Sequence, residues 1–272
     1  MATVAGRLIG PGRIGEPGSR VARAIDRWIY VYMAASFIVV TLTGFIPDAI
    51  EKEAAIRAGQ RPPFPLVLHV HAVLMALFLL LLLTQTALMA TGRRALHQWL
   101  GRSAMVLVPA IVVVGFILAP TNYHLFWNAA QSAPPALQHK LQVRLHQLDL
   151  IALMQIRIGI LFPLLVWIGL SARKSDSAFH KRMMILATAV PLGAAIDRMN
   201  WLPTTLPASP LGSDLYILAI VSPMFIWDLV RSRTVHRAYA TWIGICLVIS
   251  IPLYALWGTQ WVHSAVPRLM GV

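Results

Sequence analysis

The chain has 272 residues, of which 58% are hydrophobic and only 12% are charged, whereas soluble domains are about 45–50% apolar and about 25% charged. This composition and a mean hydropathy of +0.69 exclude a typical soluble enzyme and a disordered chain. The formal net charge of +13 is compatible with nucleic-acid binding, with an anionic membrane surface or with the topology of a membrane protein.

Seven apolar stretches approach the length of about 20 residues that a helix needs to cross about 30 Å of hydrocarbon. In chain order they are 28–46, 64–90, 104–119, 150–170, 183–199, 215–230 and 240–257, and the third, fifth and sixth are short. The sequence therefore predicts an all-α polytopic membrane bundle of about seven transmembrane helices. We expect a basic cytoplasmic segment at 1–27, one membrane domain at 28–263 and a short outer tail at 264–272.

No apolar run precedes the first stretch, so we expect no cleavable signal peptide and expect the first span to direct insertion. If the N-terminus is cytoplasmic and the connections alternate sides, most of the 23 Lys and Arg residues fall inside. These are Arg7, Arg13, Arg20, Arg23, Arg27, Arg93, Arg94, Arg102, Arg173, Lys174, Lys181, Arg182, Arg231, Arg233 and Arg237. The positive-inside rule then places the C-terminus outside, in a bacterial inner membrane, and we expect no nucleic-acid partner.

A single cysteine, Cys246, excludes an intrachain disulfide, a Cys-based zinc site and a CxxC redox motif. The nine histidines are more informative, because in so apolar a chain each must be solvated, paired or ligated. Three of them, His97, His180 and His236, fall in expected cytoplasmic connections. The others fall at expected outer ends and loops: His69, His71, His124, His139, His146 and His263.

The outer histidines suggest a metal site. His69 and His71 point about 200° apart on a helix, so one faces the bundle and the other a loop. His139, His146 and Asp149 share a helix face. The candidate ligands are therefore His69, His71, His139, His146 and Asp149. The alternative is that these are interfacial residues, as the flanking Tyr123, Trp127 and Trp261 indicate for His124 and His263.

Topology also pairs the histidines. His71 on the second stretch and His146 before the fourth are both outside, whereas His97 before the third and His180 before the fifth are both inside. This pattern resembles the two-haem transmembrane cytochrome b family that passes electrons from ascorbate across vesicle membranes. In that family helices 2 and 4 hold one haem and helices 3 and 5 hold the other. The string LHVHAVLMALFLLLLLTQTALMATGRRALHQWLGR resembles its His-bearing second helix and HxxLG-like turn.

The chain resembles more closely a group of uncharacterised bacterial multi-span proteins that carry an HxH helix, an HxxLG turn and an HKRLM-like segment, here HKRMM from His180. That likeness covers most of the chain but implies no activity. The cytochrome likeness covers residues 69–182. His146 and His180 are 34 residues apart, about 51 Å if the chain between them is helical, so at least one lies at or beyond the interface.

The leading hypothesis is a b-type haem or metal bound by the histidine clusters for electron transfer, with a quinone or lipid-like molecule as a possible substrate. In the haem version His71 with His146, and His97 with His180, are axial ligands, while Arg182 and Arg198 pair with propionates. One alternative is a membrane hydrolase or oxygenase that holds Zn, Fe or Cu at the outer site. Another alternative is a transporter or an assembly factor. Arg157 is a further charge within a predicted span, where burial of a charge is costly.

Overall fold

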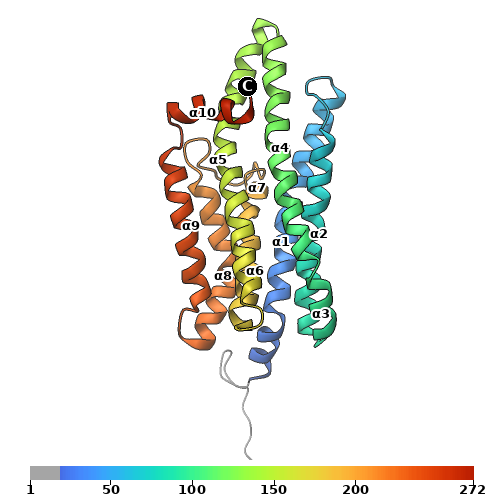
Figure 1. Ribbon diagram of the computed structural model, residues 1–272, viewed down its shortest axis with the longest axis vertical. Coiled ribbons are helices and arrows are strands. Elements are labelled where there is room, and N and C mark those ends of the chain that lie inside the picture. Colours follow the sequence, from blue (N-terminus) through green and yellow to red (C-terminus); the bar gives the residue numbers. More distant parts are fainter. Residues whose placement is uncertain (1–18) are drawn as a thin grey trace, which may run out of the picture.

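The structure is a computed structural model that describes residues 19–272, and this part of the chain is all-helical (Figure 1). Part of the basic segment expected at 1–27 lies outside the described residues, while its last eight residues already belong to the first helix. Ser19 caps that helix by accepting a hydrogen bond from the N–H of Ala22 at 3.0 Å.

Within residues 19–272, six helical segments are long and apolar enough to cross a membrane. They confirm the predicted membrane helix bundle of a multi-pass protein. They are formed by α1 (Arg20–Arg57), α2 (Leu66–Ala90), α3 (Arg94–Gly101) running into α4 (Ala104–Ser132), α5 (Pro135–Ser171), α8 (Leu211–Ser232) and α9 (Arg237–Ala255).

The fifth apolar stretch is interrupted. It contains the second half of α6 (Ser177–Ala189), the 3-10 turn η1 (Val190–Leu192) and α7 (Gly193–Ile196). The break falls at Pro191, which has no backbone N–H to continue the helix. Figure 1 shows α6, η1 and α7 running antiparallel to α5 and α8, with α7 ending short of the level of α10.

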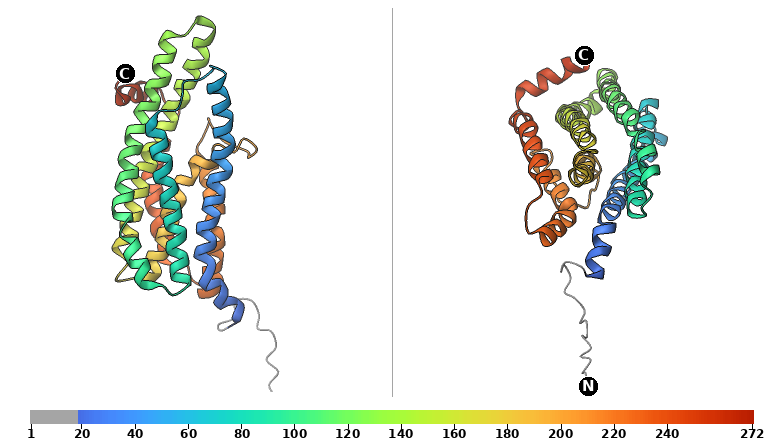
Figure 2. Two further views of the ribbon diagram at one scale, coloured as in Figure 1. Left: turned by 90° about the vertical axis from the view of Figure 1, so that its right-hand side faces the viewer. Right: turned by 60° about the horizontal axis from the view of Figure 1, so that its bottom comes forward.

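The two ends of the bundle are named here by a helix at each. The α3 end carries α3 and the first turns of α1 and α6, and the α10 end carries α10 (Gln260–Met270) and the α1–α2 connection (Figures 1 and 2). The expected outer tail at 264–272 forms most of α10, which lies across the bundle and buries Val262, Val266 and Met270 against α4 and α5. The α4–α5 hairpin projects past α10, since α5 alone has 37 residues.

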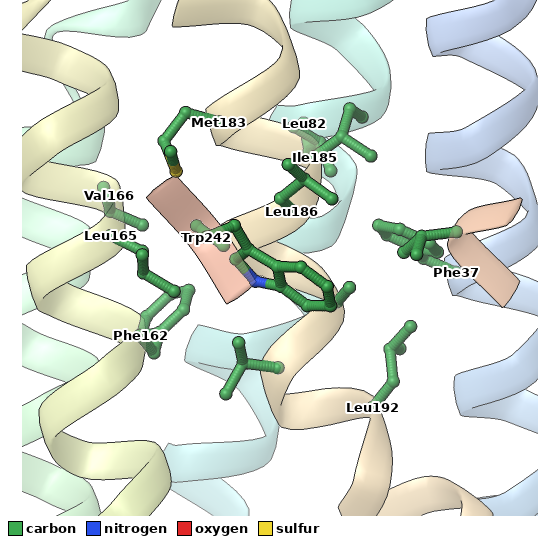
Figure 3. Packing of buried hydrophobic residues seen from close by; sticks show 14 of the residues in the cluster. Phe37, Leu82, Phe162, Leu165, Val166, Met183, Ile185, Leu186, Leu192 and Trp242 are labelled. Carbon is green, nitrogen blue, oxygen red and sulfur yellow. The ribbon is translucent and has the colours of Figure 1, made fainter. Parts of the chain in front are cut away.

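The core is organised around α6, which packs against α1, α5, α8 and α9. In the end view of Figure 2, α5 and α6 lie in the middle of the bundle. Figure 3 shows Met183, Ile185 and Leu186 of α6 meeting Leu165 of α5 and Trp242 of α9. Large apolar side chains such as Val106 and Val248 remain more than 70% exposed, as expected of surfaces that face lipid.

Close backbone approach brings α7 against α1. A Cβ at Gly44 would lie 2.1 Å from the carbonyl oxygen of Ala195, so only glycine fits there. This contact positions the residues that follow α7, among them Arg198, beside the end of α1. It thereby joins segments that are about 150 residues apart in the sequence.

Candidate functional site

His97 lies on α3, a short helix that folds back against α2 after the turn at Gly92, whose φ of 78° is the left-handed conformation that glycine favours. Its Nδ1 lies 3.3 Å from the backbone oxygen of Gln85 on α2. The side-chain amide of Gln85 donates a hydrogen bond to the backbone oxygen of His97 (3.0 Å) and accepts one from the N–H of Gly101 (3.1 Å). Gln85 therefore fixes α3 and the His97 ring together.

His180 lies in the first turn of α6, which begins where Asp176 accepts a hydrogen bond from the N–H of Phe179 at 2.9 Å. Its Nδ1 lies 2.8 Å from the backbone oxygen of Gly169 on α5. A carbonyl oxygen only accepts, so Nδ1 carries the proton and Nε2 keeps its lone pair.

The two rings lie at the α3 end, close enough for their charges to interact. Burial lowers the pKa of His180, the positive charges of His97 and Arg173 lower it further, and the hydrogen bond to Gly169 opposes both effects. In both histidines the preceding helix engages Nδ1, and within residues 19–272 Nε2 makes no hydrogen bond. The amide nitrogen of Gln85 also lies 2.5 Å from His97 Nδ1, so the backbone fixes a free Nε2 lone pair only for His180. Neutral imidazole with a free Nε2 is the form that ligates iron, copper or zinc.

Arg182, the predicted propionate partner near this site, is already engaged. Its Nε and Nη2 donate to the two carboxylate oxygens of Asp228 at 2.7 and 2.6 Å. The Tyr239 hydroxyl donates to the same carboxylate at 2.5 Å, and Arg182 Nη1 donates to the backbone oxygen of Ala178. This network ties α6 to α8 and α9, and a propionate would have to compete with Asp228 for the guanidinium.

The third histidine of this end has a structural task. His236 precedes α9, and its Nδ1 accepts a hydrogen bond from the N–H of Ala238 at 3.2 Å. That bond satisfies one of the free backbone donors in the first turn of a helix.

At the α10 end, Asp149 is the centre of a buried network. Its side chain is only 2% exposed. Oδ1 accepts a hydrogen bond from the Tyr123 hydroxyl and Oδ2 pairs with His263 Nδ1, both at 2.8 Å. The His263 ring stacks on His146, with ring centroids 4.6 Å apart and planes at 27°. Both carboxylate oxygens therefore have partners, and His146 meets the network through its ring face.

The remaining histidines of this end are dispersed. His71 faces the bundle, because its ring packs where Gly115 of α4 leaves room, and its Nδ1 is buried without a hydrogen bond. His69 is exposed, with its ring edge to Phe64. His139 is exposed near the start of α5. His124 Nε2 lies 2.8 Å from the backbone oxygen of Met270 and helps to hold α10.

The predicted outer metal ligands are thus not gathered into one site. Within the described part of the chain, no group of three or more His, Cys, Asp or Glu side chains is placed to hold a metal ion. In the same residues, no hydrogen bond or ring contact joins His71 to His146. The structure brings His146 and Asp149 together only through His263.

Two members of the Asp149 network, Tyr123 and His263, were expected to be interfacial residues. Tyr123 is instead 3% exposed. No spacing in the sequence links His263 to Asp149, which lies 114 residues earlier. The sequence carried one signal, the four-residue spacing of Val262 and Val266, which indicates an apolar helix face in the segment that forms α10.

Charges at membrane depth are paired, as the cost of burying them requires. Arg157 of α5 donates to Asp214 of α8 at 2.6 Å, and the Tyr254 hydroxyl donates to the same carboxylate at 2.6 Å. Within residues 19–272, Asp197 and Arg198 form no direct ion pair, although their charges interact. Asp197 accepts a hydrogen bond from Ser213, and Arg198 Nε lies 3.3 Å from Asp48.

Comparisons of the chain with protein-family models, with curated proteins and with solved structures find no match.

Proposed function

We propose that this multi-pass membrane protein binds a b-type haem or a redox-active metal ion through His97 and His180 and serves electron transfer. The observation that carries the proposal is that two histidines from different helices lie at the α3 end, close enough for their charges to interact, with Nδ1 of each held by a neighbouring helix and Nε2 of His180 free. A haem iron or copper ion held by imidazoles supplies one-electron chemistry.

The residues present fit such a group. Each ring is oriented by the backbone of the helix before it, Gln85 for His97 and Gly169 for His180, which is how proteins orient histidine ligands. Burial of His180 favours the neutral, ligating form. The predicted second pair, His71 with His146, has no comparable arrangement, so the proposal rests on the α3 end, with the buried and unpartnered His71 as the ligand candidate at the other end.

The topology belongs to the same proposal. It comprises seven crossings, with α6, η1 and α7 as the broken fifth, a cytoplasmic α3 end and an outer α10 end, in a bacterial inner membrane. The supporting observation is that the basic connections around Arg93, Arg173 and Arg233 all lie at the α3 end.

The test is the absorption spectrum and metal content of detergent-purified protein made in haem-replete, metal-replete cells. We expect either a Soret band with a reducible α-band or stoichiometric iron or copper. His97→Ala and His180→Ala should each lower the bound cofactor at least about tenfold, because a two-imidazole site loses half of its protein ligands. Colourless, metal-free wild-type protein would overturn the proposal.

The matched control is His139→Ala, which removes an exposed histidine from α5 at the opposite end. Its cofactor content should equal that of the wild type. Equal losses in His139→Ala and His180→Ala would show that the absorbance reports general instability, and the assignment of His97 and His180 would fall.

A further inference from the structure

Four cationic side chains converge at the α10 end, far from His97 and His180. Lys52 lies near the end of α1, Arg61 in the α1–α2 connection, Arg144 on α5 and Arg198 just after α7. The guanidinium groups of Arg61, Arg144 and Arg198 all interact electrostatically with one another, and Lys52 interacts with Arg61 and Arg198. We call these four side chains and Asp48 the Asp48 cluster.

Asp48 is the one carboxylate that these cations share among the described residues. Its Oδ2 lies 2.6 Å from Lys52 Nζ and 3.3 Å from Arg198 Nε. Arg61 and Arg144 both approach the ring of Phe126, each with Cζ 5.6 Å from the centroid. Four cations and one carboxylate leave a formal excess of three positive charges. The excess stays positive even if the exposed Glu51 beside Asp48 and Asp197, which interacts electrostatically with Arg198, are both counted.

Two guanidinium groups of the cluster have unmet donors. Arg61 Nε is buried without a hydrogen-bond partner, and within residues 19–272 the Arg61 guanidinium forms no hydrogen bond or ion pair. Arg198 Nε is also buried without a hydrogen bond, although it lies within ion-pair distance of Asp48. Unpaired buried charge is costly, and proteins normally compensate it with a counter-ion or a ligand.

The environment of Arg61 shows this cost. Burial lowers the pKa of Arg61, Arg198 lowers it further, and Asp48 alone opposes them. The cluster also runs against the positive-inside bias of the chain, because four of the few cations at the α10 end are drawn to one place. Topology therefore does not explain it.

We propose that the Asp48 cluster binds an anionic phosphoryl group between the guanidinium groups of Arg61, Arg144 and Arg198. The planar fork of arginine matches the oxygens of phosphate, and several forks around one anion neutralise the excess charge. The phosphoryl group belongs either to an anionic phospholipid at the bundle end or to free phosphate. This inference does not depend on the proposed cofactor.

The test compares purified protein in nanodiscs of phosphatidylcholine, with and without phosphatidylglycerol, and in phosphatidylcholine with millimolar inorganic phosphate. Lipid retention is read by native mass spectrometry and stability by thermal unfolding. We expect selective retention of phosphatidylglycerol and a raised Tm if the source is a lipid. A raised Tm with inorganic phosphate and no selectivity for phosphatidylglycerol would identify the free anion.

The variant is the double substitution Arg61→Gln/Arg144→Gln, which should weaken the preferred anion about tenfold or more through the loss of charge-assisted hydrogen bonds. Arg57→Gln/Lys140→Gln is the matched control, since it removes two exposed cations from the same end outside the cluster. The control should bind as the wild type does. Equal effects of the two double variants, or no response of wild type to either anion, would overturn the site.

Discussion

The two ends of the bundle use histidine in different ways. At the α3 end, backbone carbonyl oxygens lie beside Nδ1 of His97 and His180, and among the described residues Nε2 of neither ring makes a hydrogen bond. At the α10 end, His263 is held by the buried carboxylate of Asp149, and its ring is covered by His146. A histidine held by a backbone dipole from one side remains available on the other, whereas a stacked histidine in a carboxylate network serves packing. The cover over the ring therefore distinguishes the structural histidine here from a candidate ligand, because carboxylates and backbone carbonyls both orient ligating histidines.

The largest effect is expected from removing the centre of the network at the α10 end. Asp149→Ala should destabilise the protein by about 3–5 kcal/mol, because Tyr123 and His263 are left buried without their acceptor. Thermal unfolding in detergent measures the loss, and limited proteolysis should show the release of α10. Cofactor content at the α3 end should stay unchanged in the protein that remains folded.

Tyr123→Phe is the mild counterpart, since it removes one hydrogen bond and keeps the ring. This substitution should lower the free energy of unfolding by about 1 kcal/mol. If Asp149→Ala abolished the bound cofactor and Tyr123→Phe lowered it in proportion to its smaller loss of stability, the cofactor site would lie at the α10 end and not at the α3 end.

Arg182 separates stability from cofactor binding at the α3 end. Arg182→Gln should destabilise the protein by about 3 kcal/mol, because it leaves Asp228 buried with Tyr239 as its main donor. The double variant Arg182→Gln/Asp228→Asn should recover much of this stability and retain the cofactor. Thermal unfolding and the absorption spectrum measure both quantities. Cofactor loss that persists in the stable double variant would show that Arg182 binds the cofactor, as the haem hypothesis expected.

The smallest expected effect concerns pH at the α3 end. The hydrogen bond from the Phe179 N–H, together with Arg237, keeps the pKa of Asp176 below its usual value of 3.8 against the effect of burial. A lowered pKa in the folded state contributes stability above the unfolded-state pKa, and this stability is lost as the pH falls through the folded value. Acidification below about pH 4 should therefore lower the Tm of the wild type more than that of Asp176→Asn. If the Tm of the wild type and that of Asp176→Asn fell in parallel with pH, ionised Asp176 would not stabilise the start of α6.

Much of the architecture was predictable because the bilayer requires long apolar helices whose backbone groups are satisfied internally. Composition alone locates the six long helical segments, although it underestimates α4 and α5, whose polar continuations past Ala119 and before Leu150 form the projecting hairpin. The broken fifth segment was recognisable only as a short stretch. Pro191 explains the break, but the close approach of Gly44 to α7 depends on how the helices pack.

The candidate sites were less predictable, because a side chain's partner lies on another helix. Sequence spacing grouped His139, His146 and Asp149 on one face of α5, but the partners of Asp149 come from α4 and α10. The haem hypothesis paired Arg182 with a propionate, whereas its partner in the structure is Asp228, 46 residues later.

The sequence by itself determined a membrane-spanning helical bundle, the concentration of its cations in the connections of one end and the presence of histidines at both ends. These follow from composition and from the length of hydrocarbon that a helix must cross. Only the tertiary structure decided that His71 and not His69 faces the bundle, that Asp149 is enclosed by Tyr123 and His263, and that Arg61 forms no ion pair within residues 19–272. The physical reason is that ligation and charge pairing act over a few ångströms between helices, whereas hydropathy acts along each helix separately.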